Sequence, residues 1–253
     1  MTAYLIPAIV ALLASMLTFF SGFGLGTLLT PVFALFFPVD VAIASTALVH
    51  FINNLFKLAI TAKHINKRVL FEFGLPAFFA SSGGALVLFF LGQRDELYTY
   101  QIAHHSFQIT WMKCAIGIMI ILFSVLENLK SKSMEQKSLF FGGLLSGFCG
   151  GLSGNQGAVR SMFLNSIQLS KEAYIATGVA IACFTDVARM SVYYKTLSYG
   201  NTDLQLIAAA SIAAITGALI GKKLLSKTTD VFINKFVQLF LIIMGVCMIL
   251  GLV

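Results

Sequence analysis

Long apolar runs separated by short polar stretches dominate the hydrophobic pattern of this chain. The runs cover residues 4–20, 27–37, 41–62, 70–92 and 108–128 in the first half, and 139–149, 156–168, 173–194, 204–225 and 232–252 in the second. Runs of about 20 apolar residues are long enough to cross a bilayer as helices. In each half two short runs precede three full-length ones, so the pattern predicts ten helical segments in two similar sets.

Composition strengthens this interpretation. Of the 253 residues, 58% are hydrophobic and only 11% are charged, and the mean hydropathy is +0.90. A soluble domain with that balance would leave large apolar patches facing water. The N-terminus lacks a basic region, so residues 4–20 are expected to be the first membrane segment and not a cleaved signal peptide. The predicted fold is all-α, a polytopic integral membrane protein.

The net charge of +7 does not indicate nucleic-acid binding, because most basic residues lie in short loops between apolar runs. The cysteines lack CxxC spacing, so they suggest neither a disulfide framework nor a zinc site. We therefore expect no metal, no cofactor and no nucleic-acid partner. Apart from membrane lipid, the expected partner is a small solute, and the oligomeric state stays open.

Several residues recur at a nearly constant offset. Asn54 and Lys57 stand 132 residues before Asp186 and Arg189. The tripeptides Gly-Ala-Leu (84–86 and 217–219) and Ser-Gly-Phe (21–23 and 146–148) recur at offsets of 133 and 125. We therefore predict an internal duplication, with a first transmembrane repeat at 1–129, a cytoplasmic connector at 130–138 and a second repeat at 139–253.

The basic residues predict the orientation in the cytoplasmic (inner) membrane, because loops rich in Lys and Arg stay in the cytoplasm. One side receives Lys63, Lys67, Arg68, Lys130, Lys132, Lys137, Lys171, Lys222, Lys223, Lys227 and Lys235, and the other receives Arg94, Lys113 and Lys195. The loop between the third and fourth segments is then cytoplasmic in the first half and external in the second. The repeats are therefore predicted to be inverted, as in many transporters, with both termini external.

The two short segments of each half lead to a candidate site. At 1.5 Å per residue they reach only part-way through a hydrocarbon core of about 30 Å. Their glycine-rich turns, SGFGLGT (21–27) and GGLSGNQG (150–157), are expected to meet near the midplane. Irregular backbone is tolerated at that depth only where it is buried in protein or lines a wet cavity.

A helix that starts at such a turn offers unpaired N–H groups and the positive end of its dipole to an anion. The candidate substrate-binding residues are Gly24, Gly26, Thr27, Ser153, Gly154, Asn155, Gln156, Gly157 and Arg160. An alternative interpretation is that the glycines serve close helix packing and that Arg160 snorkels to the cytoplasmic interface.

A polar stripe marks the third helix of each half. His50, Asn53, Asn54 and Lys57 share one helical face, and Asp186 and Arg189 occupy the corresponding positions of the second half. Ionisable groups inside a membrane usually line ion pathways. The candidate pathway or coupling residues are His50 (a possible proton site), Asn54, Lys57, Asp186 and Arg189. The alternative is an internal Asp186–Arg189 ion pair with Lys57 snorkelling outward. Residues 93–107 are expected to be a solvated external loop.

These motifs, in this order, resemble the TauE/SafE sulfite-exporter family. The resemblance rests on GFGLGTLLTP (22–31), VAIASTALV (41–49), GFCGGLSGNQGAV (147–159), EAYIATGVAIA (172–182) and SYGNTD (198–203). Where the family tends to have consecutive glycines and a proline, this chain has Asn155-Gln156-Gly157-Ala158 and then Arg160. The resemblance implies transport, often export, of sulfite or related organosulfur anions across the cytoplasmic membrane.

The leading functional hypothesis is a non-enzymatic secondary transporter of a small sulfur-containing oxyanion that works by alternating access. A passive anion channel is the first alternative, since the same turns would serve it. A rhomboid-like serine protease is the second, because Gly151-Leu152-Ser153-Gly154 matches GxSG. It is disfavoured because no histidine follows residue 105 to act as the base. The identity of the anion, the direction of transport and the coupling ion stay open.

Overall fold

The computed structural model describes residues 2–17, 24–103, 105–126, 138–199, 203–224 and 231–253. Its helices are α1 (Thr2–Leu17), α2 (Leu25–Ala34), α3 (Val39–Thr61), the 3-10 turn η1 (Ala62–His64), α4 (Lys67–Gly92), α5 (Trp111–Leu126), α6 (Leu139–Ser153), α7 (Gln156–Leu164), α8 (Lys171–Tyr199), α9 (Leu204–Leu224) and α10 (Val231–Ile249). The strands are β1 (Tyr98–Ile102) and β2 (His105–Ile109). All ten predicted segments are helical, which confirms the all-α class.

Within the part of the chain that the structure describes, four helices are long and apolar enough to cross a membrane: Val39–His64, Lys67–Gly92, Lys171–Tyr194 and Leu204–Lys223. Large apolar side chains such as Phe79, Phe90 and Ile212 lie exposed on them. This arrangement suits helices whose outer faces meet lipid. In the first half, α5 begins at Trp111 and not at the predicted residue 108, and residues 127 and 128 of the predicted segment lie outside the described residues.

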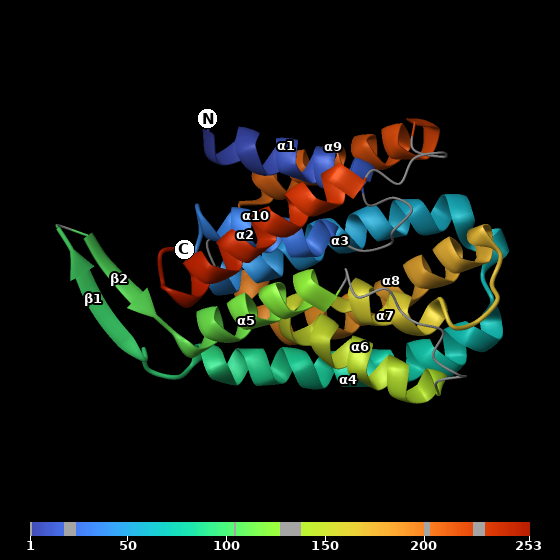
Figure 1. Cartoon of the computed structure of the whole chain (residues 1–253), viewed down its shortest axis with the longest axis horizontal. Coiled ribbons are helices and arrows are strands. Elements are labelled where there is room, and N and C mark those ends of the chain that lie inside the picture. The colour runs from blue at the N-terminus through green and yellow to red at the C-terminus, as the bar shows by residue number, and fades with distance from the viewer. Residues whose placement is uncertain (1, 18–23, 104, 127–137, 200–202, 225–230) are drawn as a thin grey trace.

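The helices pack mainly across the two halves of the sequence. α1 lies along α9, and α6 lies along α4, while α3 and α8 pack against each other and α5 packs on α10. Figure 1 shows α1 and α9 on one flank of the bundle, α4 and α6 on the opposite flank, and α3 and α8 in between. Each half therefore depends on the other for its core. The inverted relation of the halves stays a prediction.

Glycines bring α6 into backbone contact with α4. Gly143, Gly147 and Gly151 repeat every four residues on one face of α6. A Cβ atom on each would lie within 2.2, 2.2 and 1.9 Å of the carbonyl oxygens of Phe73, Ala77 and Ser81, respectively. Only glycine permits that approach, so at these three positions the interpretation as packing glycines is correct. Because Gly151 sits beside Ser81, α6 ends near the middle of α4.

Glycines of α9 make the same kind of backbone contact with α1. A Cβ atom on Gly217 or Gly221 would lie 2.1 or 2.3 Å from the carbonyl oxygen of Leu12 or Met16 on α1. The beginnings of the same two helices are also joined, because the Tyr4 hydroxyl donates a hydrogen bond to Asp203. That hydrogen bond, more than the two backbone N–H groups that Asp203 also caps, holds the pKa of its carboxyl below the usual value.

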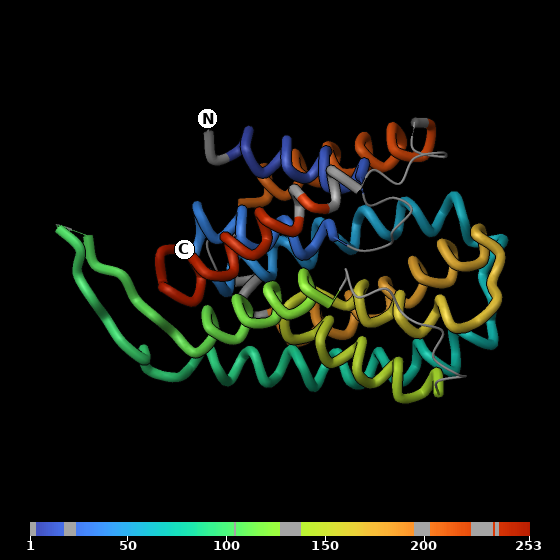
Figure 2. The backbone as a smooth tube through the Cα atoms, in the orientation of Figure 1, coloured from blue at the N-terminus to red at the C-terminus, as the bar shows by residue number. Residues whose placement is uncertain are grey.

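A β-hairpin projects from one end of the bundle (Figures 1 and 2). β1 pairs antiparallel with β2, with Tyr100 opposite Phe107, and the Tyr100 hydroxyl donates to the Leu250 carbonyl at 2.6 Å. Residues 93–107 were predicted to be a solvated external loop, and most of the hairpin is indeed exposed, but its two strands were not predicted. The start of α1 and the C-terminus lie at the same end of the bundle (Figure 1).

Candidate functional site

The two glycine-rich turns lie side by side inside the bundle. Gly24 (φ 115°) precedes α2, and Gly154 (φ 78°) ends α6, and both need the left-handed conformation that glycine tolerates. A Cβ atom on Gly26 would lie 3.5 Å from the Gly154 carbonyl oxygen. The N-terminal ends of α2 and α7 thus come together, as the sequence predicted. Residues 21–23 of the first turn lie outside the described residues.

Asn155 sits where α7 begins, as its N-cap residue, and is only 1% exposed. Its side chain makes no capping hydrogen bond, and neither its Oδ1 nor its Nδ2 atom has a partner among the described residues. A buried polar group left unpaired costs about 1–3 kcal/mol, so such groups are rare in folded proteins. A buried amide without a partner beside a helix N-terminus is a candidate contact for a polar solute.

Asp186 on α8 is the centre of a buried polar cluster. Its Oδ1 atom accepts hydrogen bonds from Nε (3.0 Å) and Nη2 (2.8 Å) of Arg189. Its Oδ2 atom accepts from Nδ1 of His50 (2.8 Å) and from the amide of Asn54 (3.1 Å) on α3. Asp186, its two partners on α3 and Arg189 are all buried. The structure therefore brings together four of the five predicted pathway residues, and the predicted Asp186–Arg189 ion pair exists.

The geometry also sets the tautomer of His50. Because Nδ1 faces a carboxylate oxygen, it carries the proton, and the Asn54 amide, which is also 3.0 Å from Nδ1, must donate to Asp186 instead. The carbon edge of the imidazole lies beside the first glycine turn: a Cβ atom on Gly26 would lie 3.7 Å from Cδ2 and 3.9 Å from Cγ of His50. The ring therefore connects the carboxylate to the space where the two turns meet.

Arg189 reaches the second turn as well. Its Nη1 atom would lie 2.9 Å from a Cβ atom on Gly154, so the guanidinium lies directly against that turn. Its Nε and Nη2 atoms are used by Asp186, as described above. The ion pair and the glycine turn are thus parts of one site, because a larger residue at position 154 would push the guanidinium away from the carboxylate.

Lys57 and Arg160 are buried, with exposures of 5% and 3%, so the predicted snorkelling of both residues is wrong, whereas the ion pair and the packing glycines of the same alternatives are present. Arg160 lies against α8, where a Cβ atom on Gly178 would be 3.5 Å from its Nε atom. Lys57 interacts with Arg160 electrostatically. Its Nζ atom also lies 3.3 Å from the Asn53 amide oxygen when that amide is oriented to donate to the Ala214 carbonyl.

The other predicted ligand residues are less available than expected. The Ser153 hydroxyl donates to the Cys149 carbonyl one turn earlier on α6, so its hydrogen is already used. It therefore gives no support to the serine-protease alternative. The Gln156 side-chain oxygen accepts from Thr185 at 2.6 Å, which links α7 to α8. Thr27 is buried on α2, and the Gly157 carbonyl accepts from Ser161 within α7.

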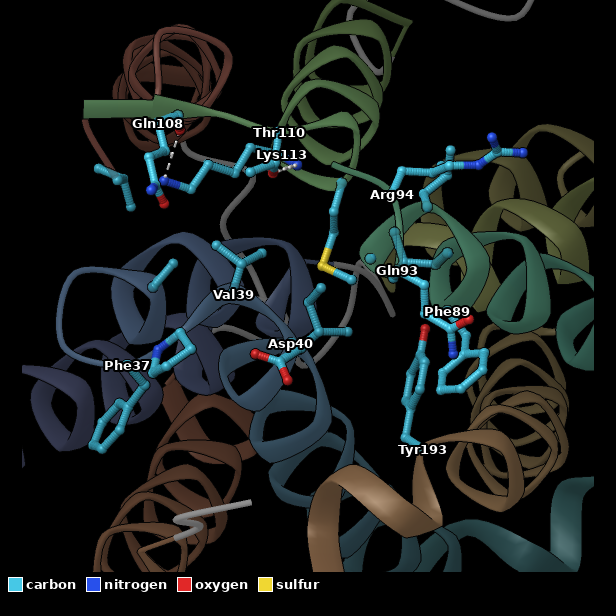
Figure 3. A pocket seen from close by; sticks show the side chains of 18 residues that line it. Phe37, Val39, Asp40, Phe89, Gln93, Arg94, Gln108, Thr110, Lys113 and Tyr193 are labelled. Carbon is cyan, nitrogen blue, oxygen red and sulfur yellow. Dashed lines mark hydrogen bonds between the residues drawn. The ribbon is translucent and has the colours of Figure 1, made fainter. Parts of the chain in front are cut away.

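A cavity of about 470 Å³ opens at the hairpin end of the bundle (Figure 3). Its walls come from α2, α3, α4, β2, α5, α8 and the C-terminus, and carry both aromatic and charged side chains, including Phe37, Asp40, Phe89, Arg94 and Lys113. Figure 3 shows Tyr193 projecting into it from α8. We call this cavity the vestibule. It was not predicted, because its lining residues come from seven separate segments of the chain.

The family comparison decides the class of protein. The model of the "Sulfite exporter TauE/SafE" family matches residues 7–248 of the 253. The chain belongs to the TauE/SafE family. A search of curated proteins found none that matches the chain. A search of solved structures found no match either.

Membership confirms the resemblance seen in the sequence, and its match spans α1 to α10. The TauE/SafE family is one of sulfite exporters, so this TauE/SafE protein is a member of a membrane-transporter family. The long apolar helices agree with that class. Within the family framework, the two glycine turns, Asn155 and the Asp186 cluster are the features of this chain from which a substrate site can be argued.

Proposed function

We propose that this TauE/SafE protein is a secondary transporter that exports a small sulfur-containing oxyanion, such as sulfite or a related organosulfonate. The anion binds between the two glycine turns, in contact with the N-terminal ends of α2 and α7. The observation that carries the proposal is the buried, unpartnered amide of Asn155 at the start of α7, beside the other turn. Its Nδ2 group and the first N–H groups of α7 supply the hydrogen-bond donors that an oxyanion requires.

The charge of the site supports an anionic substrate. Among the described residues, the buried ionic side chains comprise three cations, Lys57, Arg160 and Arg189, and one carboxylate, Asp186. With neutral histidine the sum is 3 − 1, or +2. Burying net charge is costly unless opposite charge accompanies it. A bound dianion such as sulfite would balance this excess, whereas a cation would increase it.

His50 is the residue best placed to couple transport to protons. Its Nδ1 atom is held by Asp186, and its ring lies beside Gly26 of the first turn. Asp186 also accepts hydrogen bonds from Asn54 and Arg189, so the ring contacts both the buried polar cluster and the proposed anion site. Export of the anion is then coupled to proton movement if the anion and a proton are carried together.

The cross-half packing supports alternating access. In the predicted inverted repeat, α1 and α2 belong to one half and α6 and α7 to the other, so the site lies where the halves meet. Movement of one half against the other would expose the site first to one end of the bundle and then to the opposite end. In the proposed orientation the hairpin, both termini and the vestibule face the outside of the cytoplasmic membrane.

The first prediction tests the anion site. Replacing Arg160 with alanine is expected to weaken sulfite binding about 10- to 100-fold, the amount expected when a charged hydrogen-bonding partner is lost. Isothermal titration of purified protein with sulfite, thiosulfate and sulfoacetate measures the effect. Arg68→Ala is the matched control, because Arg68 is exposed and pairs with Glu72 on the surface of α4. It should bind the same anions normally.

Two results would overturn the proposal. Either no anion binds to the unaltered protein, or Arg160→Ala binds every anion as tightly as the Arg68→Ala control does.

Electrical recording in planar bilayers separates the carrier from a passive channel: a carrier gives saturable coupled flux, whereas unitary currents would establish the channel instead.

A further inference from the structure

Three of the residues that line the vestibule are buried and come from three helices: Ile43 on α3, Leu88 on α4 and Tyr193 on α8. We call them the closing layer. None of the proposed ligand residues of the two glycine turns lines the vestibule. Figure 3 shows Tyr193 projecting from α8 beside Phe89. The cavity volume of about 470 Å³ is ample for a small solute.

The three closing residues stand in register with the polar centre. Ile43 lies seven residues from His50, and Tyr193 lies seven residues from Asp186. Leu88 lies seven residues from Ser81, whose hydroxyl donates to the Thr185 carbonyl next to Asp186. Seven residues are two helical turns, so each pair shares a face and is separated by about 10 Å along its helix. The layer is thus a thin barrier directly over the site.

Tyr193 connects this barrier to the second glycine turn. Its hydroxyl donates a 2.7 Å hydrogen bond to the carbonyl of Gly151, three residues before Gly154. The side chain is only 5% exposed, and a buried tyrosine hydroxyl needs such a partner. The bond therefore joins α8 to α6, which carries the turn. Any movement of α6 away from α8 breaks the bond and withdraws support from the layer.

We propose that Ile43, Leu88 and Tyr193 form the gate between the vestibule and the anion site, with the Tyr193–Gly151 hydrogen bond as its latch. The inference rests on the proposed function, since it assigns the route to the same site. Ile43 and Leu88 supply an apolar barrier that a hydrated anion does not cross. Tyr193 ties the closed gate to the turn that holds the anion, so opening and anion binding affect each other.

The test measures access through the gate. Ala47 is fully buried and lies on α3 between Ile43 and His50, on the same face. Ala47→Cys is introduced into a variant whose four native cysteines are replaced, and the protein is reconstituted in vesicles. The rate of labelling by a membrane-impermeant maleimide added at the hairpin side is then measured. With the latch intact, labelling is slow.

Tyr193→Phe keeps the aromatic ring but removes the latch. It is expected to accelerate labelling about two- to tenfold, the range that corresponds to one net hydrogen bond. Tyr194→Phe is the matched control: its neighbouring tyrosine is 65% exposed, and labelling should not change. Ile43→Ala combined with Leu88→Ala opens the barrier by a second route and should also accelerate labelling.

The gate assignment fails if Tyr193→Phe and the double alanine variant both label at the rate seen with Tyr194→Phe. Elution as a single species in size-exclusion chromatography confirms that each variant is folded. The readout needs no transported anion. A failed gate with normal sulfite binding leaves the proposed function standing, and a working gate in a protein that binds no anion refutes the function alone.

Discussion

Asp186 shows how a single carboxylate can organise a site inside a membrane protein. It is fully buried, and each of its oxygens accepts two hydrogen bonds, from α3 on one side and from its own helix on the other. A charge at such depth is tolerated only when it is paired and hydrogen-bonded, and removal of one partner leaves the other uncompensated. Asp186 therefore determines the positions of both His50 and Arg189.

The second prediction concerns this carboxylate. Asp186→Asn keeps the shape of the side chain but leaves Arg189 without its counter-charge, so the free energy of unfolding is expected to fall by about 3–5 kcal/mol. Thermal unfolding in detergent measures the loss. Glu72→Gln removes the carboxylate of an exposed ion pair and should cost less than about 1 kcal/mol. Equal losses in the two variants would show that the Asp186 cluster does not stabilise the fold.

Residue spacing predicted part of this cluster and missed another part. His50 and Asn54, one turn apart, and Asp186 and Arg189, three residues apart, were placed on helical faces by counting, and they do meet. The role of Ser153 as a donor was not predictable in this way. The hydroxyl of a serine within a helix can donate to the carbonyl four residues earlier, as Ser153 does to Cys149. The sequence does not show whether a given serine makes this hydrogen bond or offers its hydroxyl to a ligand. Tyr193 carried a usable signal, its seven-residue spacing from Asp186. Gly151 was noted as part of the glycine-rich turn, but nothing in the sequence paired it with Tyr193.

At the scale of the element, the α6–α4 contact positions the second turn. The three packing glycines of α6 hold its backbone against α4 up to Ser81, and Gly154 follows within one turn. The position of the turn is therefore set by backbone contact and not by large side chains. Small residues are the means by which membrane helices achieve such close packing.

The third prediction tests that contact. Gly147→Ala puts a methyl group 2.2 Å from the Ala77 carbonyl oxygen, so α6 must move away from α4. We expect a loss of about 1–3 kcal/mol in unfolding free energy, as for other overpacked sites, together with weaker sulfite binding. Unfolding and titration are both measured. Gly83→Ala on α4 is the control, because a Cβ atom on Gly83 would meet no other atom within 4 Å. Normal sulfite binding by Gly147→Ala would mean that the turn does not depend on this contact.

The ten helices were predictable because each lies on a continuous apolar run and polar stretches separate the runs. The hairpin was missed although its sequence carries the signal. Tyr98, Tyr100 and Ile102 alternate with the polar Thr99 and Gln101, the two-residue period of a strand. In a chain dominated by membrane segments, this short alternation was interpreted as part of a loop. The structure also shows that the strand region displaces the start of α5 to Trp111.

At the scale of the whole molecule, the fourth prediction concerns the orientation in the membrane, with the hairpin outside and the end of α3 that carries Lys63 in the cytoplasm. Thr99→Cys on the hairpin should react with an impermeant thiol reagent from outside intact cells, whereas Lys63→Cys at the opposite end of α3 should react only after the membrane is opened. Both residues are exposed, so access to solvent is matched. Each cysteine is introduced singly into the variant whose native cysteines are replaced. Labelling of the two positions from the same side would refute the proposed topology.

The cross-half arrangement was beyond sequence reasoning. Offsets of 132 and 133 residues indicated two related halves, but they could not show that α1 packs on α9 or that α6 packs on α4. Such pairing depends on which glycine faces which backbone, and that information appears only when helices distant in the sequence are placed together. The vestibule was unpredictable for the same reason, since its walls combine segments from both ends of the chain.

The pairing of α1 with α9 also affects how the protein is made. The ribosome releases the N-terminal helix first, yet the surface that covers its inner face, around Gly217 and Gly221, is synthesised some 200 residues later. During that interval α1 can pack against α2, but the face that later meets α9 is left to lipid or an insertion factor. Assembly is completed only when the penultimate helix arrives, so a chain that stops before α9 exposes the Leu12 and Met16 side of α1 to cellular quality control.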